Sequence, residues 1–456
     1  MMFLFYSTSI AQSTVTINAS RKYQTINGFG LFLECRPGRT SSISSSDLFD
    51  IVVNDLGISI IRIPFPAGFE IENDNDDPNS FNWSAFDPTR LYTEGDCFGR
   101  PPGTVGGEYN VEVEMIEGFA KAGTRFFVTP WIIPNWLWNN NNREAEYAEM
   151  MSAFIQDFQK RGIIIEWMSI LNEPDMGVCM SASPSEVMQI AEHLQARFQL
   201  DRIPTKIIAP ECGAWNVNNY NPNSVGDPDI YAYHYGVGNL NDGDARIIRS
   251  LWDNSRIPIW NTEFWAGWAN QPDTHEEAMS TAELLHYYLT GTNCSGLIFF
   301  NGYGSGGGKM VLVNVSWSPL RVNGYTPKYY AFRQFSRFIP VGAQRIETSG
   351  NLKGILISAY LHSNGIFTLV VLNTNNQSES IDFSLNSLSV SFLHKIRYSK
   401  TENGQLIGNL TVSGNSFTDT LPAYSVTTYT TQSSNLPPVV DVTPPMPPTG
   451  VRVNNP

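Results

Sequence analysis

Two glutamates stand where strand-length apolar segments end. Glu173 follows Asn172 after the segment 163–171, and Glu263 lies at the end of the segment 257–264. If both segments are strands of one parallel barrel, their carboxyl ends meet at the same face of that barrel. Two carboxyls facing each other across the width of a sugar can cleave a glycosidic bond, one as general acid and the other as nucleophile or base. The pair therefore predicts glycoside hydrolysis.

The elements that must position this pair alternate along the chain. Apolar segments of strand length are separated by helical patterns, and they cover residues 28–34, 58–65, 125–131, 163–171, 206–211, 230–235, 257–264 and 295–301. Continuously apolar strands between helices indicate a parallel sheet buried on both faces. Eight such units predict an α/β protein with a closed (β/α)8 TIM barrel.

Two helix starts are marked by their chemistry. Ser183 precedes Pro184 and is followed three residues later by Glu186, the pattern of a capping box. Thr326 precedes Pro327 in the same manner.

The pattern changes to short alternating strands after about residue 340. These strands cover residues 354–361, 367–373, 380–385, 394–399 and 425–430, and the stretch 13–26 before the barrel alternates as well. We therefore expect residues 12–26 and 340–432 to form an antiparallel β-sandwich side domain built from both chain ends. The barrel of residues 27–339 is then an insertion between its two parts.

Both ends of the chain carry segments outside these domains. Residues 1–11 resemble the apolar part of a secretory signal without a basic start, which favours an extracellular protein. Residues 433–456 are rich in proline, and 447–453 resemble the first strand of a fibronectin-type module. We expect a linker toward a C-terminal accessory module on an otherwise monomeric protein.

Composition excludes several classes of partner. The chain of 456 residues has 29 Lys and Arg against 43 Asp and Glu, a net charge of −14, which opposes binding to nucleic acid or to anionic membranes. The cysteines lack the C-x-x-C spacing of zinc sites, and glycosidic cleavage by two carboxyls needs no metal ion and no organic cofactor. We expect none.

The 5 cysteines leave at least one thiol unpaired within the chain. Cys179 and Cys212 follow neighbouring barrel strands, as do Cys35 and Cys97. We therefore expect disulfides 179–212 and 35–97, with Cys294 buried and free.

Five segments together resemble glycoside hydrolase family 30, most closely its xylanase-like branch. They are Asn27-Gly28-Phe29-Gly30, residues 169–175, Trp260-Asn261-Thr262-Glu263, residues 328–343 and residues 421–429. The resemblance covers nearly the whole chain. It implies a (β/α)8 barrel joined to a side β-sandwich and a retaining double displacement.

The resemblance also implies roles for the polar residues. Glu173 corresponds to the general acid/base and Glu263 to the nucleophile, Asn172 to the asparagine that binds the sugar 2-hydroxyl, and Arg62 to the arginine that braces the nucleophile. Because the acid must start protonated, we expect apolar surroundings and the charge of Glu263 to raise the pKa of Glu173.

Strand six departs from the family pattern. Tyr235 resembles the tyrosine that contacts the nucleophile, but Tyr233 stands where the family has histidine and His234 is offset by one, so either of these two could face the sugar. Trp131 after strand three is the expected sugar platform, and Trp265 is a weaker one. Other weak candidates are Trp136, Trp138 and Trp215.

The segment after strand eight, residues 300–309, carries Lys309 and no arginine, although the glucuronoxylan-specific members hold a uronic acid there with arginine and tyrosine. We predict no strict dependence on glucuronic acid. The sequence favours an endo-β-glycanase acting on β-1,4-xylan, with a β-1,6-glucanase or galactanase second. A catalytically silent carbohydrate-binding barrel stays open, and a structural or adhesion role leaves the paired glutamates unexplained.

Overall fold

A computed structural model describes most of the chain. The described residues are 13–33, 46–65, 69–87, 109–138, 140–177, 181–235, 242–265, 273–305, 308, 310–317, 320–350 and 352–432. The expected signal and linker segments and Lys309 lie outside them, as do Cys35 and Cys97. Among the described residues, no helix has both the length and the apolar character needed to cross a bilayer.

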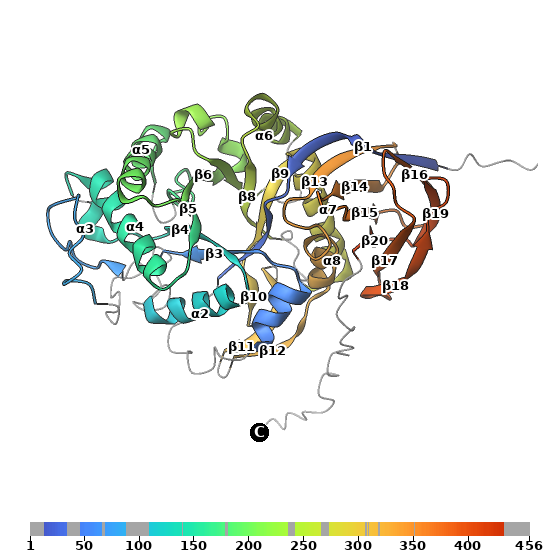
Figure 1. Ribbon diagram of the computed structural model, residues 1–456, viewed down its shortest axis with the longest axis horizontal. Coiled ribbons are helices and arrows are strands. Elements are labelled where there is room, and N and C mark those ends of the chain that lie inside the picture. The colour runs from blue at the N-terminus through green and yellow to red at the C-terminus, as the bar shows by residue number, and fades with distance from the viewer. Residues whose placement is uncertain are drawn as a thin grey trace, which may run out of the picture.

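Strands β2 to β9 close into a parallel barrel, as the eight apolar segments predict (Figure 1). In chain order they are β2 Gly28–Phe32, β3 Ile60–Pro64, β4 Arg125–Thr129, β5 Ile165–Ser169, β6 Lys206–Gly213, β7 Ile230–His234, β8 Ile259–Phe264 and β9 Cys294–Phe299. The barrel closes because β9 pairs with β2 in parallel. The (β/α)8 prediction is therefore confirmed.

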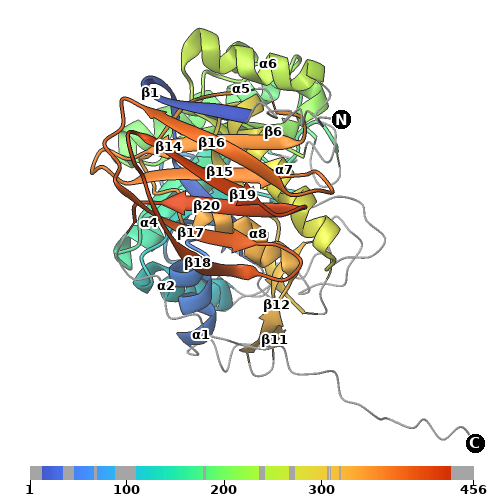
Figure 2. The same ribbon diagram turned by 90° about the vertical axis from the view of Figure 1, so that its right-hand side faces the viewer.

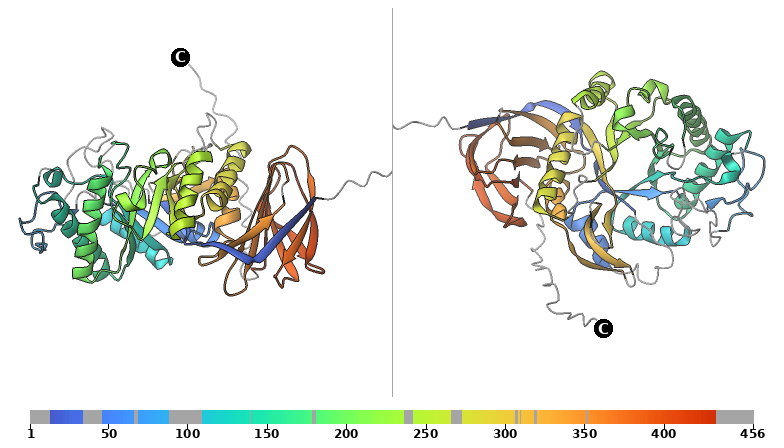
Figure 3. Two further views of the ribbon diagram at one scale, coloured as in Figure 1. Left: turned by 90° about the horizontal axis from the view of Figure 1, so that it is seen from above. Right: turned by 180° about the vertical axis from the view of Figure 1, so that it is seen from behind.

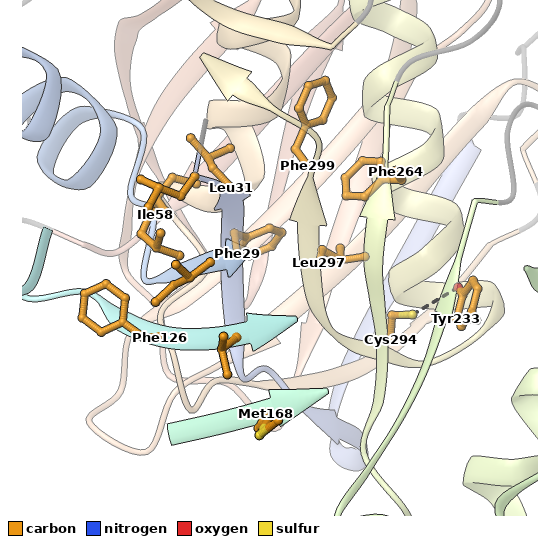
Figure 4. Packing of buried hydrophobic residues seen from close by; sticks show 14 of the residues in the cluster. Phe29, Leu31, Ile58, Phe126, Met168, Tyr233, Phe264, Cys294, Leu297 and Phe299 are labelled. Atoms are coloured by element: carbon orange, nitrogen blue, oxygen red, sulfur yellow. Dashed lines mark hydrogen bonds between the residues drawn. The ribbon is translucent and has the colours of Figure 1, made fainter. Parts of the chain in front are cut away.

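The interior of the barrel is filled by large side chains. One buried cluster holds Ile60, Phe127, Trp167, Ile208, Ile230, Ala232, Trp260 and Ile298. Gly296 makes room for Trp260, because a Cβ at this position would lie 2.4 Å from the indole ring. A second cluster fills the layer between strands and helices and includes Phe126, Met168 and Leu297 (Figure 4).

Helices cover the outside of the barrel. They are α1 Ser46–Phe49 with a π-helical turn Asp50–Asp55, α2 Tyr109–Lys121, α3 Asn135–Trp138, α4 Arg143–Lys160, α5 Pro184–Asp201, α6 Asp242–Ser255, α7 His275–Gly291 and α8 Pro327–Ser336, with 3₁₀ turns at Ala214–Asn216 and Pro222–Ser224. The side chain of Ser183 caps α5 in a capping box with Glu186, as predicted. Thr326 is the N-cap of α8 and Pro327 opens that helix.

A nine-stranded sheet lies beside the barrel and curves around its own apolar core (Figures 2 and 3). Its strands are β1 Ser13–Thr25, β13 Gln344–Ser349, β14 Ile355–Leu361, β15 Phe367–Asn373, β16 Glu379–Asn386, β17 Phe392–Tyr398, β18 Asn403–Thr411, β19 Ser416–Leu421 and β20 Ser425–Thr430. β1 pairs antiparallel with β13 and parallel with β16. The side sheet is thus built from both chain ends, as expected, with one parallel pair that the sequence did not indicate.

The structure adds elements that the sequence reading missed. A three-stranded sheet of β10 Gly302–Gly304, β11 Val311–Trp317 and β12 Leu320–Tyr325 follows the last barrel strand. In the side sheet, β13, β18 and β19 were not predicted.

The predicted disulfide between Cys179 and Cys212 is wrong, because Cys212 is a free buried thiol. Its strand β6 continues to Gly213, so Cys212 lies within the strand instead of in the loop after it. Cys294 is buried and free, as predicted.

Candidate active site

The carboxyls of Glu173 and Glu263 meet at the carboxyl-terminal end of the barrel. One oxygen of each lies within 4.8 Å of the other and of a ring nitrogen of His234. Retaining glycosidases hold their two carboxyls about 5–5.5 Å apart, whereas inverting enzymes leave a wider gap for water. The observed spacing fits the retaining geometry.

Local backbone irregularities aim both glutamates inward. Glu173 follows β5 in the left-handed conformation, with φ of 48°. In β8 the register with β9 shifts between Asn261 and Phe264, and Glu263 lies opposite His234 of β7. Left-handed backbone at non-glycine residues costs about 1–3 kcal/mol and is concentrated at functional sites.

Arg62 of β3 braces the nucleophile candidate. Its Nη1 donates to Oε2 of Glu263 at 2.6 Å and its Nη2 donates to Oδ1 of Asn172 at 2.6 Å. Its Nε donates to Oγ1 of Thr129 at 3.1 Å. The guanidinium is fully buried, so these bonds fix the positions of Glu263 and Asn172 relative to each other.

His234 lies inside the site and bridges two carboxylates. Its Nδ1 is 3.1 Å from Oε1 of Glu173 and its Nε2 is 3.2 Å from Oε1 of Glu211. Although burial opposes the charge, the hydrogen bonds from these carboxylates raise the pKa of His234 to about 9. A charged imidazole carries a proton on each ring nitrogen, so His234 donates to both Glu173 and Glu211.

Sequence reasoning missed Glu211, whose carboxylate contacts the ring nitrogen of His234 that does not contact Glu173. It is fully buried in β6 with φ of 58°, and its Oε1 lies 3.5 Å from Nη2 of Arg62. Against the cost of burial, Arg62 and His234 lower its pKa to about 2. The signal in the sequence is a glutamate closing an apolar strand, the same signal that marked Glu173 and Glu263.

Tyr235 contacts both members of the pair. Its hydroxyl donates to Oε1 of Glu173 and lies 3.5 Å from Oε1 of Glu263. Tyr235 is also in the left-handed conformation, with φ of 61°. Nδ2 of Asn261 donates a hydrogen bond to the backbone carbonyl of Tyr235 at 2.9 Å.

Tyr233 is not part of the site, which corrects its assignment as a candidate sugar-facing residue. Its side chain is fully buried on the helix side of β7, with its hydroxyl 3.2 Å from Sγ of Cys294 and 3.2 Å from Oγ1 of Thr292 (Figure 4). Successive side chains of a strand point to opposite faces. Ile230 and Ala232 belong to the cluster inside the barrel, so His234 continues that face and Tyr233 cannot.

The pKa values of the two glutamates shift in opposite directions. Burial would raise the pKa of Glu173, but the hydrogen bonds from His234 and Tyr235 lower it overall. Burial raises the pKa of Glu263 despite the charges of His234 and Arg62. The expected upward shift of the pKa of Glu173 is therefore wrong, because the sequence did not reveal that His234 lies beside this carboxyl.

Aromatic rings border the pair. Trp131 is partly exposed and stacks on Phe32 at 5.1 Å and on Phe300 at 5.6 Å. Because the two phenylalanines lie only 4.9 Å apart, they share one face of the indole. Trp265 is buried and meets Tyr235 edge to face at 4.9 Å.

The weaker platform candidates differ in exposure. Trp215 is 57% exposed and stacks on Tyr235 with an interplanar angle of 3°. Trp136 is partly buried and donates its indole N–H to the backbone carbonyl of Glu70 at 3.0 Å. The side chain of Trp138 lies outside the described part of the structure.

Comparison with known proteins gives a family match for the side sheet. Residues 342–429 match the sequence profile described as "Glycosyl hydrolase family 30 beta sandwich domain". The chain carries the β-sandwich domain of glycoside hydrolase family 30. The resemblance read from the five sequence segments is thereby confirmed.

Other comparisons extend over the barrel as well as the side sheet. Glucuronoxylanase XynC of Bacillus subtilis (strain 168) is 24% identical over 444 residues, which cover 92% of each chain. The fold resembles that of a GH30 endoxylanase from Clostridium papyrosolvens C71, with a TM-score of 0.70 and 20% identity over 92% of this chain and 99% of the other. It also resembles the endo-β1,6-glucanase BT3312, with a TM-score of 0.64 and 18% identity over 92% and 95%.

The charge of His234 makes a testable contribution to stability. Its pKa is about 9 in the folded protein against 6.5 for a free imidazole, so its contribution is fully present below pH 6.5 and is lost as the pH rises through 9. We expect His234→Asn to cost more stability at pH 6 than at pH 9.5, with the two costs differing by up to about 3 kcal/mol. Urea unfolding of both proteins across this range measures the difference. An equal cost at both pH values would contradict the charged imidazole.

Proposed function

We propose that this protein is a retaining endo-β-glycanase that hydrolyses a cell-wall polysaccharide, with β-1,4-xylan as the favoured substrate. The observation that carries the proposal is the approach of the Glu173 and Glu263 oxygens to within 4.8 Å at the end of a barrel. The alignment with glucuronoxylanase XynC over 92% of the chain supports the choice of xylan.

In the first step Glu263 attacks the anomeric carbon while Glu173 gives its proton to the departing glycosidic oxygen. Arg62 keeps Glu263 aimed, because two bonds fix the guanidinium between Glu263 and Asn172, and its charge favours the ionised carboxylate against the effect of burial. Asn172 binds the sugar 2-hydroxyl in the resemblance to family 30, a contact that gains strength in the transition state.

The proton for this step comes from His234. Because its pKa is lowered, Glu173 is ionised and accepts from Nδ1 of the His234 imidazolium at 3.1 Å. Transfer of the Nδ1 proton to Oε1 of Glu173 leaves a protonated acid, a neutral imidazole and an ionised Glu263. The approach of the glycosidic oxygen favours this transfer. That oxygen accepts a hydrogen bond from protonated Glu173, whereas the ionised carboxylate has no proton to donate.

In the second step the charge of Glu263 has vanished into the glycosyl ester. Glu173, ionised again after giving up its proton, takes a proton from water, which attacks the anomeric carbon and restores Glu263. Tyr235 keeps both carboxyls in place through its hydroxyl. Two inversions at one carbon give net retention.

The proposal includes action outside the cell, because cell-wall polysaccharide is an extracellular substrate. It also includes action as a monomer. It also includes independence from glucuronic acid side chains, because the segment after the last barrel strand offers Lys309 in place of an arginine fork. No metal ion or cofactor takes part in the proposed steps.

Product analysis on a substrate panel tests the function. We expect purified protein to release xylo-oligosaccharides from both glucuronoxylan and unsubstituted β-1,4-xylan, at rates within about tenfold of each other, because residues 300–309 carry no arginine to select the uronic acid. Pustulan, a β-1,6-glucan, and β-1,6-galactan serve as the alternative substrates. Release from pustulan or galactan alone would replace xylan, and no release from any of them would favour the carbohydrate-binding barrel.

A further inference from the structure

A second group of carboxylates lies away from the glycosidase pair. Glu70 and Asp74 belong to the segment after β3, and Glu149 belongs to α4; one oxygen of each lies within 4.8 Å of the others. We call these three residues the acidic cluster. In Figure 1 the segment lies against α3 and α4, on the side of the barrel far from the nine-stranded sheet.

Local hydrogen bonds orient two of the three carboxylates. The backbone N–H of Asp74 donates to Oε1 of Glu70 at 3.1 Å, and the backbone N–H of Asn82 donates to Oδ2 of Asp74. Each bond uses one oxygen of its carboxylate. The other oxygens, Oε2 of Glu70 and Oδ1 of Asp74, are buried without a hydrogen-bond partner.

Glu149 is the most isolated member of the cluster. Its side chain is 1% exposed, and neither of its oxygens has a hydrogen-bond partner. Glu146, one turn earlier on α4, is also 1% exposed, and its Oε2 is likewise buried without a hydrogen-bond partner. Oδ1 of Asn73, which precedes Asp74 in the same segment, is likewise buried and without a hydrogen-bond partner.

Among the described residues, no ion pair balances these charges. Arg197 acts on Glu149 through its charge, but its guanidinium is bound to Asp201 at 2.6 Å. Burial therefore raises the pKa of Glu149 to about 9 and that of Glu70 to about 8. Buried carboxylates without partners cost several kcal/mol each, so a stable fold needs a counter-charge or protons here.

We propose that the acidic cluster binds one Ca²⁺ ion. The ligands that the acidic cluster offers are all carboxylate oxygens, which suits a hard cation and not zinc or copper. Ca²⁺ takes six to eight oxygens in a flexible arrangement, whereas Mg²⁺ demands a near-ideal octahedron and keeps much of its water. A cavity of about 20 Å³ adjoins Glu70 and Asp74, which is room for one ion or one water.

The ion has a structural role in this proposal, separate from the chemistry of Glu173 and Glu263. It ties the segment 69–87 to α4, where Phe69 already packs on Phe154 at 5.5 Å. In the same segment, the backbone carbonyl of Glu70 accepts a hydrogen bond from the indole N–H of Trp136. Calcium therefore fixes the loop that positions Trp136.

Calcium titration of the chelator-treated full chain tests the proposal. We expect isothermal titration calorimetry with CaCl₂ to show one site per chain, with MgCl₂ binding at least about tenfold more weakly. At a hundredfold excess over the dissociation constant, the melting temperature should rise by about 3 °C or more. The absence of saturable Ca²⁺ binding up to about 10 mM, or tighter binding of Mg²⁺, would overturn it.

Two variants assign the binding to the cluster. Glu149→Gln and Asp74→Asn should each weaken Ca²⁺ binding by at least about tenfold, because each removes one ligand charge. Glu192→Gln makes the same chemical change at an exposed position of α5 and should leave binding unchanged. Unchanged affinity in both cluster variants would contradict the assignment, and the wild-type titration stands by itself if a variant fails to fold.

Discussion

The Glu263→Ala variant is expected to hydrolyse xylan about 10⁴-fold more slowly than the wild type, a loss of about 5 kcal/mol of transition-state stabilisation. Without this carboxylate no glycosyl-enzyme can form, and the charge that Arg62 aims at the anomeric carbon is gone. Hydrolysis measured by released reducing sugar gives the rate. More than a tenth of wild-type activity would contradict the role of Glu263 as nucleophile.

Azide provides the specific readout for this variant. The alanine leaves space for a small anion, which attacks an activated aryl glycoside from the side opposite the leaving group and yields a glycosyl azide of inverted configuration. Glu263→Gln is the matched control, because it also removes the charge but keeps the side-chain volume, so azide should not restore its activity. Proton NMR of the product identifies the configuration.

The Glu173→Ala variant is expected to lose about 10²–10⁴-fold of its activity on xylan, the usual contribution of general acid–base catalysis. The loss should shrink for the first step on a dinitrophenyl glycoside, because its leaving group needs no proton. Burst kinetics on the two kinds of substrate separate the steps. An equal loss in the first step on both would argue against the acid role.

Azide acts differently on this second variant. The glycosyl-enzyme still forms on Glu263, and azide then attacks it from the other face, giving a product of retained configuration. Opposite configurations from the Glu173 and Glu263 variants would assign both roles in one experiment. Glu173→Gln is the control that keeps the side-chain volume near His234 and Tyr235.

The barrel could be predicted because its strands are continuously apolar. Such segments stay recognisable without knowledge of their neighbours, and all eight correspond to strands β2 to β9. The missed strands β18 and β19 have the opposite character, since many of their residues are exposed and polar. Their place in the sheet follows from pairing with β17 and β16, which no local pattern reveals.

The paired glutamates could be predicted for the same reason, but their partners could not. The choice between Tyr233 and His234 depends on which face of β7 looks inward, and every residue of that strand is buried. Glu211 carries no mark that separates a structural from a functional carboxylate until Arg62 and His234 are seen beside it. The pKa expectation for Glu173 failed for this reason, because it left out the cation that lies 3.1 Å away.

The pairing of β1 has a consequence for how this chain is made. The first strand of the side sheet leaves the ribosome early, yet its neighbours β13 and β16 lie more than 300 residues later, as the pairing of Thr16 with Ser349 shows. Domains fold during synthesis as their residues emerge. The barrel can thus fold while the backbone hydrogen-bonding groups along both edges of β1 are still unpaired. Until β13 and β16 have been synthesised, this nascent strand exposes unpaired backbone edges, the kind of surface that chaperones shield.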